Sequence, residues 1–484
     1  MDYEDDPMYS DNDSDEEIHE IAVEHDNKQH KFDVDYELLD HRDLLKELDV
    51  LVSDTSAVIG FSSGICKILL HKFNWNKEFL IEKFYEFNDK DKFLRESNVV
   101  EAKDASDKGR VETCQICFEE FKLTGLSCKH MYCLNCWKNY LGVKILDECL
   151  WQIPCPGLKC TRVLDEEFVE RLSQSKQVME VFHKQVLNSF VQSSTVLKWC
   201  PGVDCGYVAK VPHPECRAIV CKCRMVFCFM CSQEWHQPVD CVMLKKWLKK
   251  CNDDSETSNW LNANTKDCPQ CHVTIEKDGG CNHMTCKNVS CRFEFCWTCL
   301  GPWKPHGSGW YSCNRFDDTD AKKARDEQER SRAALQRYLH YYNRFMNHKN
   351  SLKLEKKLNT QVEEKMKQLQ QMDFSWIETQ SVSKAVGVLN ECRRTLMYTY
   401  AFAFYLEKSN QATIFENNQN DLELATEQLS ELLEKELDTE KDKLKTWKQV
   451  VQDKYRYLAS RRTALLKHVE DGNEKHEWVF NTKI

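Results

Sequence analysis

The chain has 484 residues, and 25 of its 27 cysteines lie in a window of 200 residues from Cys114 to Cys313. Cysteine of this density is typical of small disulfide-rich secreted domains, but this chain is long enough for several domains of about 100 to 200 residues each. The formal net charge is −11, of which residues 1–20 supply −10, so the remaining 67 basic and 68 acidic side chains nearly cancel. Nucleic-acid binding requires a basic field, and the balanced charge disfavours it.

Residues 1–38 are acidic and low in apolar content, which predicts a disordered tail. The basic start and apolar core of a secretory signal are absent from residues 1–20. The longest aliphatic and aromatic stretch, Leu396–Leu406, falls short of the roughly 20 residues that span a bilayer. We therefore expect a cytoplasmic or nuclear protein that contacts no membrane and whose thiols stay reduced. Dense cysteine in that setting indicates metal binding or catalysis.

Residues 39–98 have apolar side chains at helical spacing, which predicts a small bundle of short helices. One apolar row contains Ile65 and Leu69, and a second contains Leu80 and Phe84.

The first cysteine-rich segment, residues 110–162, contains ligand pairs at the short spacings that let one loop offer two zinc ligands. The order of the pairs is typical of a RING finger, in which two zinc sites are interleaved. The eight predicted ligands are Cys114, Cys117, Cys128, His130, Cys133, Cys136, Cys155 and Cys160.

Residues 163–198 lack glycine and proline and are expected to form linker helices. The second cysteine-rich segment, residues 199–242, also offers eight ligands for two zinc ions. These are Cys200, Cys205, Cys221, Cys223, Cys228, Cys231, His236 and Cys241. A further linker helix is expected over residues 243–265, where four lysines at helical spacing favour a solvated helix face.

The third segment, residues 266–315, contains nine candidate ligands for eight places. Omitting Cys281 preserves the order of the last six ligands of the second segment, whereas omitting Cys286 leaves a poor chelating pair. The predicted ligands are then Cys268, Cys271, Cys286, Cys291, Cys296, Cys299, His306 and Cys313. The three segments together predict 24 ligands for six zinc ions.

Cys281 is therefore predicted to be a thiol without a metal. Gly279 and Gly280 precede it and could allow an exposed turn, and His283 follows two residues later. These neighbours favour a reactive thiol, while an inert buried thiol is the alternative. The other unassigned cysteines of the window, Cys149, Cys216 and Cys251, are expected to be inert.

Residues 320–484 contain five apolar stripes at helical spacing with polar interruptions, which favour an antiparallel helical bundle. A dimerising coiled coil is the alternative, but sustained heptads are not evident.

The series of a RING, an in-between-RING module and a second RING resembles the RING-between-RING ubiquitin ligases. The segment from Cys268 to Cys313 and the helical segment from Cys392 to Leu406 look most like the Ariadne subfamily. This resemblance implies a multidomain fold class in which helices join small zinc-binding modules. It also implies a ubiquitin-associated-like (UBA-like) domain over residues 39–98 and an all-α Ariadne domain over residues 320–484, which covers the catalytic cysteine and inhibits the enzyme.

The resemblance further implies a relay mechanism. The first RING recruits a ubiquitin-charged conjugating enzyme, with Ile116 matching the apolar contact residue. Ubiquitin passes to Cys281 as a thioester and then to a substrate lysine. His283 matches the general base, and Glu294 matches the position that orients this histidine. Thr161 follows the last ligand of the first RING, where ligases that transfer ubiquitin directly often carry a basic residue, and this departure favours the relay.

The UBA-like domain implies recognition of neddylated cullin-RING ligases, which would release the covered cysteine. Two other functions remain open from the sequence. A zinc-stabilised adaptor would bind protein partners without chemistry, and a nucleic-acid-binding protein would use its zinc modules for contact.

Overall fold

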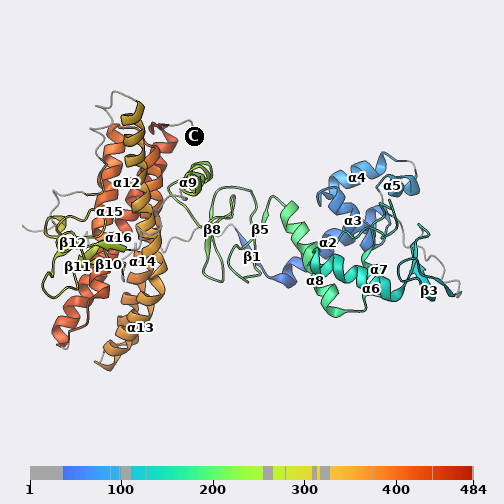
Figure 1. Ribbon diagram of the computed structural model, residues 1–484, viewed down its shortest axis with the longest axis horizontal. Coiled ribbons are helices and arrows are strands. Elements are labelled where there is room, and N and C mark those ends of the chain that lie inside the picture. Colours follow the sequence, from blue (N-terminus) through green and yellow to red (C-terminus); the bar gives the residue numbers. More distant parts are fainter. Residues whose placement is uncertain are drawn as a thin grey trace, which may run out of the picture. The chain divides into compact units, whose positions relative to one another are not determined.

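The computed structural model describes residues 36–87, 89–97, 99, 111–126, 128–253, 265–277, 280–307, 313–316, 327–372, 374–438 and 440–481. The chain divides into two compact units, Met1–Glu234 and Trp235–Ile484. Figure 1 shows the ribbon of the chain, coloured from blue at the N-terminus to red at the C-terminus.

Among its described residues, the N-terminal part of the first unit contains four short helices, α2 (His41–Ile59), α3 (Ser63–Lys72), α4 (Lys77–Tyr85) and α5 (Lys90–Glu96). Asp40 caps α2 by accepting hydrogen bonds from the Arg42 and Asp43 N–H groups, and Gly60 ends it in the left-handed conformation that favours glycine. The predicted rows, including Leu69 and Leu80, are buried in the core of this unit.

A strand precedes these helices. The sequence predicts a disordered tail over residues 1–38, but Glu37–Leu39 form β1, which pairs antiparallel with β6 (Val208–Lys210). Lys210 also donates a hydrogen bond to Glu47 of α2 at 2.5 Å. The tail prediction is therefore wrong for its last residues, because their backbone bonds are satisfied by a distant sheet edge. Residues 1–35 lie outside the described part of the chain.

The first RING contains the three-stranded sheet β2 (Val111–Thr113), β3 (Glu120–Gly125) and β4 (Met131–Cys133). Helix α6 (Leu134–Gly142) follows, and a single π-helical segment, η1 (Val143–Asp147), extends it. Two helices then occupy the predicted linker, α7 (Glu166–Ser173) and α8 (Lys176–Ser193). Asp165 and Ser175 cap them by accepting hydrogen bonds from the N–H groups of Phe168 and Val178.

The in-between-RING module of the first unit has four short strands. Strand β5 (Leu197–Trp199) pairs with β6, and β7 (Ala218–Val220) pairs with β8 (Val226–Cys228). The strands are three residues long, so the loops between them have to be fixed by other means, and most of the cysteines of this module lie in these loops.

The second unit contains α9 (Cys241–Asp253) and the two short hairpins of the second RING. Strand β9 (Thr265–Asp267) pairs with β10 (Thr274–Glu276), and β11 (His283–Thr285) pairs with β12 (Glu294–Cys296). A short 3-10 helix, η2 (Lys304–Gly307), follows β12. The hairpin β11–β12 places His283 opposite Cys296 and Thr285 opposite Glu294.

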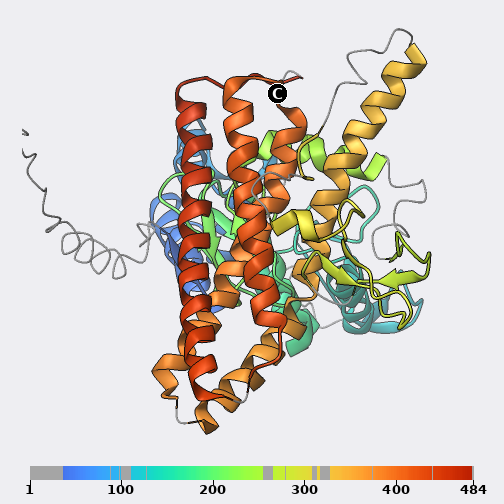
Figure 2. The same ribbon diagram turned by 90° about the vertical axis from the view of Figure 1, so that its left-hand side faces the viewer.

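Within the described residues, five helices follow, α12 (Glu327–Lys353), α13 (Glu355–Gln371), α14 (Trp376–Tyr405), α15 (Asn410–Glu434) and α16 (Lys441–Glu474). They correspond to the five predicted stripes. Figure 2 shows α15 and α16, in orange-red and red, running side by side. A capping box of Ser375 and Glu378 starts α14, and Ser409 caps α15. The stripe residues Leu389, Leu429 and Leu458 are buried.

Among the described residues, no single helix has both the length and the apolar character needed to cross a membrane. One bent pair, His41–Ile59 with Ser63–Lys72, passes this test by length and composition only.

Candidate functional site: a covered cysteine beside two metal-ligand clusters

The ligands of the first RING gather in two interleaved groups. Cys114, Cys117, Cys133 and Cys136 form one group, and Cys128, His130, Cys155 and Cys160 form the other. Each group joins pairs that are separated in sequence by a pair of the other group. This interleaving is the arrangement predicted from the order of the pairs.

The sulfur distances fit zinc. Four ligands about 2.3 Å from a tetrahedral ion lie about 3.8 Å from one another. Cys117 and Cys133 Sγ are 3.8 Å apart, and Cys128 and Cys155 Sγ are 3.6 Å apart. The donors are thiols and imidazoles with no carboxylate among them, the set that structural zinc prefers. Zinc bound there would hold loops together that the short strands alone could not fix.

The in-between-RING module has one complete group in the first unit, made of Cys200, Cys205, Cys221 and Cys223. The division between the units passes through the other half of this module. On its first-unit side, Cys216 Sγ lies 3.7 Å from Cys228 Sγ, and on its second-unit side, His236 Nε2 lies 3.6 Å from Cys241 Sγ. Cys216 was expected to be an inert thiol, so its position beside the predicted ligand Cys228 was not anticipated from the sequence. The role of Cys231 as a ligand stays a prediction.

In the second RING, Cys268, Cys271, Cys286 and Cys291 form one group, with Sγ distances of 3.6 Å between Cys271 and Cys286 and 3.8 Å between Cys268 and Cys291. His306 Nε2 lies 3.2 Å from Cys299 Sγ. Hydrogen bonds with Cys299 and Cys313 lower the pKa of Cys296 to about 3. The groups follow one another along the chain, unlike the interleaved groups of the first RING.

Cys281 is outside these clusters, and its side chain is covered. The glycine pair predicted an exposed turn, but Cys281 is only 6 % exposed, so that expectation is wrong. Its thiol lies 3.9 Å from the backbone carbonyl of Glu427 in α15, and Gly280 packs against α14. A Cβ at Gly280 would lie 2.0 Å from Arg393 Nη1, so a larger residue there would have to displace this guanidinium. Gly279 lies outside the described residues.

Two glutamates of α15 bind the backbone around Cys281. Glu434 Oε1 accepts hydrogen bonds from the N–H groups of Gly280 at 3.2 Å and Cys281 at 3.3 Å. Glu427 Oε2 accepts from the N–H of Asn282. Three consecutive N–H groups of the cysteine loop are therefore bound by two carboxylates that lie about 150 residues away in sequence.

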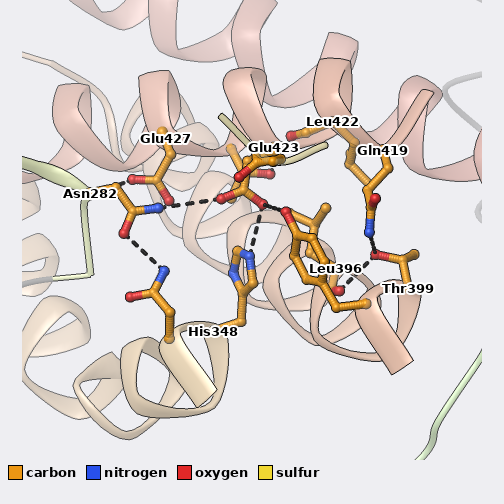
Figure 3. A network of polar contacts seen from close by, with 12 residues as sticks. Asn282, His348, Leu396, Thr399, Gln419, Leu422, Glu423 and Glu427 are labelled. Carbon is orange, nitrogen blue, oxygen red and sulfur yellow. Dashed lines mark hydrogen bonds and ion pairs between the residues drawn. The ribbon is translucent and has the colours of Figure 1, made fainter. Parts of the chain in front are cut away.

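The side chain of Asn282 continues this polar contact. Its amide nitrogen donates to Glu423 at 3.3 Å, and its oxygen accepts from Asn347 of α12 at 2.9 Å. Figure 3 shows Asn282 facing Glu427 and Glu423, with His348 donating to Glu423 at 2.8 Å. All five side chains are buried. Buried polar groups of this kind have to be bonded to one another, so the network specifies a single seating of the loop.

Electrostatics oppose a thiolate in this covered form. Burial raises the pKa of Cys281 well above its usual range, and the nearby carboxylates of Glu427 and Glu434 raise it further. Burial also raises the pKa of Glu427. Because the thiolate is the nucleophilic form, the same contacts that cover Cys281 also keep it protonated.

His283 lies next to the loop on β11. Its backbone N–H donates to Cys281 Sγ at 3.3 Å, and its ring stacks on Trp303 with the ring centres 4.3 Å apart. Its Nε2 lies 3.4 Å from Glu294 Oε2 without a hydrogen bond within the described part of the chain, and its Nδ1 lies 4.0 Å from Glu431 of α15. The structure therefore brings Cys281, His283 and Glu294 together, with Glu294 59 % exposed as a whole side chain.

The chain matches family models across both units. An "IBR domain, a half RING-finger domain" matches residues 180–241, an "IBR domain" matches 263–309, and an "Ariadne domain" matches 336–454. The "E3 ubiquitin-protein ligase ARIH1, UBA-like domain" matches residues 46–86.

Named relatives are similar over most of their length. "E3 ubiquitin-protein ligase ari-1.1" of Caenorhabditis elegans is 54 % identical, with 92 % of this chain and 90 % of the relative covered. "E3 ubiquitin-protein ligase ARIH1" of Homo sapiens is 51 % identical, with 93 % and 82 % covered. "E3 ubiquitin-protein ligase ariadne-1" of Drosophila melanogaster is 47 % identical, with 94 % and 92 % covered. The chain belongs to the Ariadne family of RING-between-RING E3 ubiquitin-protein ligases. The predicted family and fold class are thereby confirmed, with UBA-like helices, zinc-type modules and an Ariadne domain.

In this Ariadne protein the predicted docking residue of the first RING lies on the surface. Ile116 is 48 % exposed, and its neighbour Phe118 is 79 % exposed.

Several residues of the Ariadne site were missed by the sequence prediction. They are Lys277, Trp303, Glu427 and Glu434. The signal for the two glutamates was a polar row on α15, because Glu423, Glu427 and Glu434 share one face at helical spacing. A row of like charges is unfavourable on an isolated helix and therefore indicates that something binds it.

Proposed function

We propose that this Ariadne ligase transfers ubiquitin through a thioester on Cys281. The first RING binds a ubiquitin-charged conjugating enzyme with Ile116 in the contact, and ubiquitin then passes to Cys281 and on to a substrate lysine. This proposal rests on the difference between Cys281 and the other cysteines of the second RING. It is the one cysteine of the second RING left out of the described ligand contacts, and His283 lies beside it.

The residues around Cys281 suit the two steps of such a relay. Thiolate attack on a thioester exchanges one sulfur leaving group for another and needs access more than strong activation. Attack by a lysine is harder, because the ammonium first has to lose a proton. His283 is the proposed base, and Glu294, 3.4 Å from its ring, would orient it. Trp303 limits rotation of the ring by stacking on it.

The proposed enzyme is autoinhibited. Helix α15 covers Cys281, occupies the N–H groups of its loop and holds the thiol neutral. Activation would then require that α15 leave the second RING. We propose neddylated cullin-RING ligases, bound through the UBA-like domain, as the partners that cause this release. The zinc ions are proposed to number six, two in each module.

The experiment that tests the thioester uses Cys281→Ser in the full chain, together with Glu427→Ala and Glu434→Ala to uncover the loop. Incubation with activating enzyme, conjugating enzyme and ubiquitin should trap an oxyester that resists thiol reductant. The matched control, Cys251→Ser in the same background, should instead form an adduct that the reductant removes.

A zinc-stabilised adaptor is the second candidate. An adaptor would use the same modules to hold partners, and Cys281→Ala would leave its function intact. Failure to find any adduct on Cys281 in the uncovered protein, with its zinc retained, would reject the ligase relay and favour the adaptor.

A further inference from the structure

We propose that the backbone N–H groups of Gly280 and Cys281 form the oxyanion hole for ubiquitin transfer, that Lys277 positions it, and that Glu434 occupies it while the enzyme is covered. The inference rests on the proposed thioester at Cys281 and assigns the groups that stabilise its transition state.

Two adjacent N–H groups converge on a single oxygen. Gly280 and Cys281 donate to the same atom, Glu434 Oε1, at 3.2 and 3.3 Å. Successive N–H groups that point at one anion make a concave anion-binding site. An oxyanion hole has the same construction, and the N–H of the nucleophilic residue itself is a common member. The negatively charged oxygen of Glu434 therefore lies where a tetrahedral oxyanion next to Cys281 would be bound.

Lys277 fixes the peptide unit that carries the Cys281 N–H. Its Nζ donates to the carbonyl oxygen of Gly280 at 3.1 Å and to Asn282 Oδ1 at 3.1 Å. The carbonyl of Gly280 and the N–H of Cys281 belong to one trans peptide plane and point in opposite directions. An ammonium on the carbonyl side therefore aims the N–H toward the other side and polarises it. Lys277 is partly buried, and burial lowers its pKa to about 8.

The contacts of Lys277 divide into two sets. Asn347 at 2.7 Å and Ser351 at 3.4 Å are on α12, and Ser351 also donates to the carbonyl of Gly280 at 3.1 Å. The charged neighbours of Lys277 are Glu427 and Glu434 of α15 and Arg393 of α14. All of these leave with the Ariadne helices when the loop is uncovered. The bonds to Gly280 and Asn282 lie within the second RING, so Lys277 alone continues to hold the peptide.

Both steps of ubiquitin transfer form an oxyanion that this hole would bind. In the first step the Cys281 thiolate forms a bond to the carbonyl carbon of the ubiquitin thioester, and the carbonyl electron pair moves onto oxygen. Collapse of this oxyanion expels the conjugating enzyme's cysteine as a thiolate. In the second step a substrate amine attacks the Cys281 thioester, an oxyanion forms again, the nitrogen gives its proton to His283, and the Cys281 thiolate leaves. The two N–H groups stabilise each oxyanion.

A comparison of two reactions of Cys281 separates an oxyanion hole from simple exposure. Alkylation by iodoacetamide needs a reachable thiolate but forms no oxyanion, whereas ubiquitin transfer forms one. Both rates are measured in full chains that carry Glu427→Ala and Glu434→Ala, at about pH 7, below the Lys277 pKa of about 8. Each rate is divided by the Cys281 thiolate fraction, which the pH dependence of alkylation gives. Lys277→Met should slow single-turnover ubiquitin transfer about tenfold or more and leave the alkylation rate within about twofold. Lys277→Arg should restore much of the transfer rate.

Lys266→Met is the matched control. Lys266 is a partly buried lysine of the same module whose Nζ donates to the carbonyl of Trp297 at 2.6 Å. Lys266→Met should change the rate of ubiquitin transfer and the rate of alkylation by the same factor. If Lys277→Met loses its zinc, Lys277→Gln, which keeps a donor, takes its place and should show a smaller loss of transfer.

The outcomes distinguish this inference from the proposed function. Equal slowing of both reactions by Lys277→Met, or slowing of neither, overturns the oxyanion hole while the thioester stands. Absence of any thioester in the Glu427→Ala, Glu434→Ala chain overturns the proposed function, and the inference falls with it.

Discussion

The two RING modules use the same ligand chemistry and present their key residues in opposite ways. In the first RING, the side chains of Ile116 and Phe118 are exposed. In the second RING, Cys281 lies beneath α15, and its loop is bound by Glu427 and Glu434. The zinc-type ligand clusters therefore hold the loops of each RING in place, but they do not determine whether another protein can reach the key residue. Access is decided by a helix that is remote in sequence.

The largest expected effect comes from breaking a cluster of the second RING. Cys268→Ser removes a thiolate from the group with Cys271, Cys286 and Cys291, so this module should lose one zinc and its loop order. We expect transfer to a substrate to be lost, while binding of the conjugating enzyme to the first RING stays within about twofold. Zinc content by intact mass and conjugating-enzyme affinity check the two halves. If Cys268→Ser lost both substrate transfer and binding of the conjugating enzyme, the two RING modules would not be independent of each other.

A smaller effect is expected at the open surface. Ile116→Ala should reduce ubiquitin transfer about tenfold, because an exposed apolar anchor contributes to binding the conjugating enzyme. Alkylation of Cys281 should not change. Val203→Ala, another strongly exposed apolar side chain of the first unit, is the matched control and should retain full transfer. If Val203→Ala lost as much ubiquitin transfer as Ile116→Ala, Ile116 would not be a specific docking residue.

The covered thiol should also have its own pH dependence. Burial and the two carboxylates raise the pKa of Cys281, so at pH 8 the covered protein has a smaller thiolate fraction than an uncovered one. Alkylation of the parent chain should therefore increase more steeply between about pH 8 and 10 than in the Glu427→Ala, Glu434→Ala chain, whose midpoint should return toward about 8.5. Identical profiles would show that the carboxylates act by steric cover alone.

The smallest effect is expected at Glu294. Its side chain is largely exposed and makes no hydrogen bond to His283, so solvent screens the pair. Glu294→Gln should slow transfer to lysine about threefold and leave thioester formation unchanged, which single-turnover assays of the two steps would resolve. If Glu294→Gln strongly reduced thioester formation, Glu294 would have the role of holding the Cys281 loop and not that of orienting His283.

The zinc clusters were predictable because their ligands come in short local pairs, as in Cys114 with Cys117. The five Ariadne helices were predictable from their apolar stripes. The cover over Cys281 was only an expectation of the family resemblance, and its chemistry was not visible. Glu434 lies more than 150 residues from Gly280, so no local pattern links the two. The glycine pair predicted exposure, whereas the structure uses Gly280 for close approach to Arg393.

The carboxylates of α15 are proposed to keep Cys281 from reacting, and the amount of ubiquitin adduct on Cys281 measures this effect. Intact mass spectrometry would follow ubiquitin on the full chain after incubation with activating enzyme and a charged conjugating enzyme. Asp421→Ala serves as the control, because Asp421 is an α15 carboxylate that pairs with Arg461. We predict little adduct on the parent and on Asp421→Ala, and at least about tenfold more on the Glu427→Ala, Glu434→Ala chain. Equal adduct on all three would contradict it.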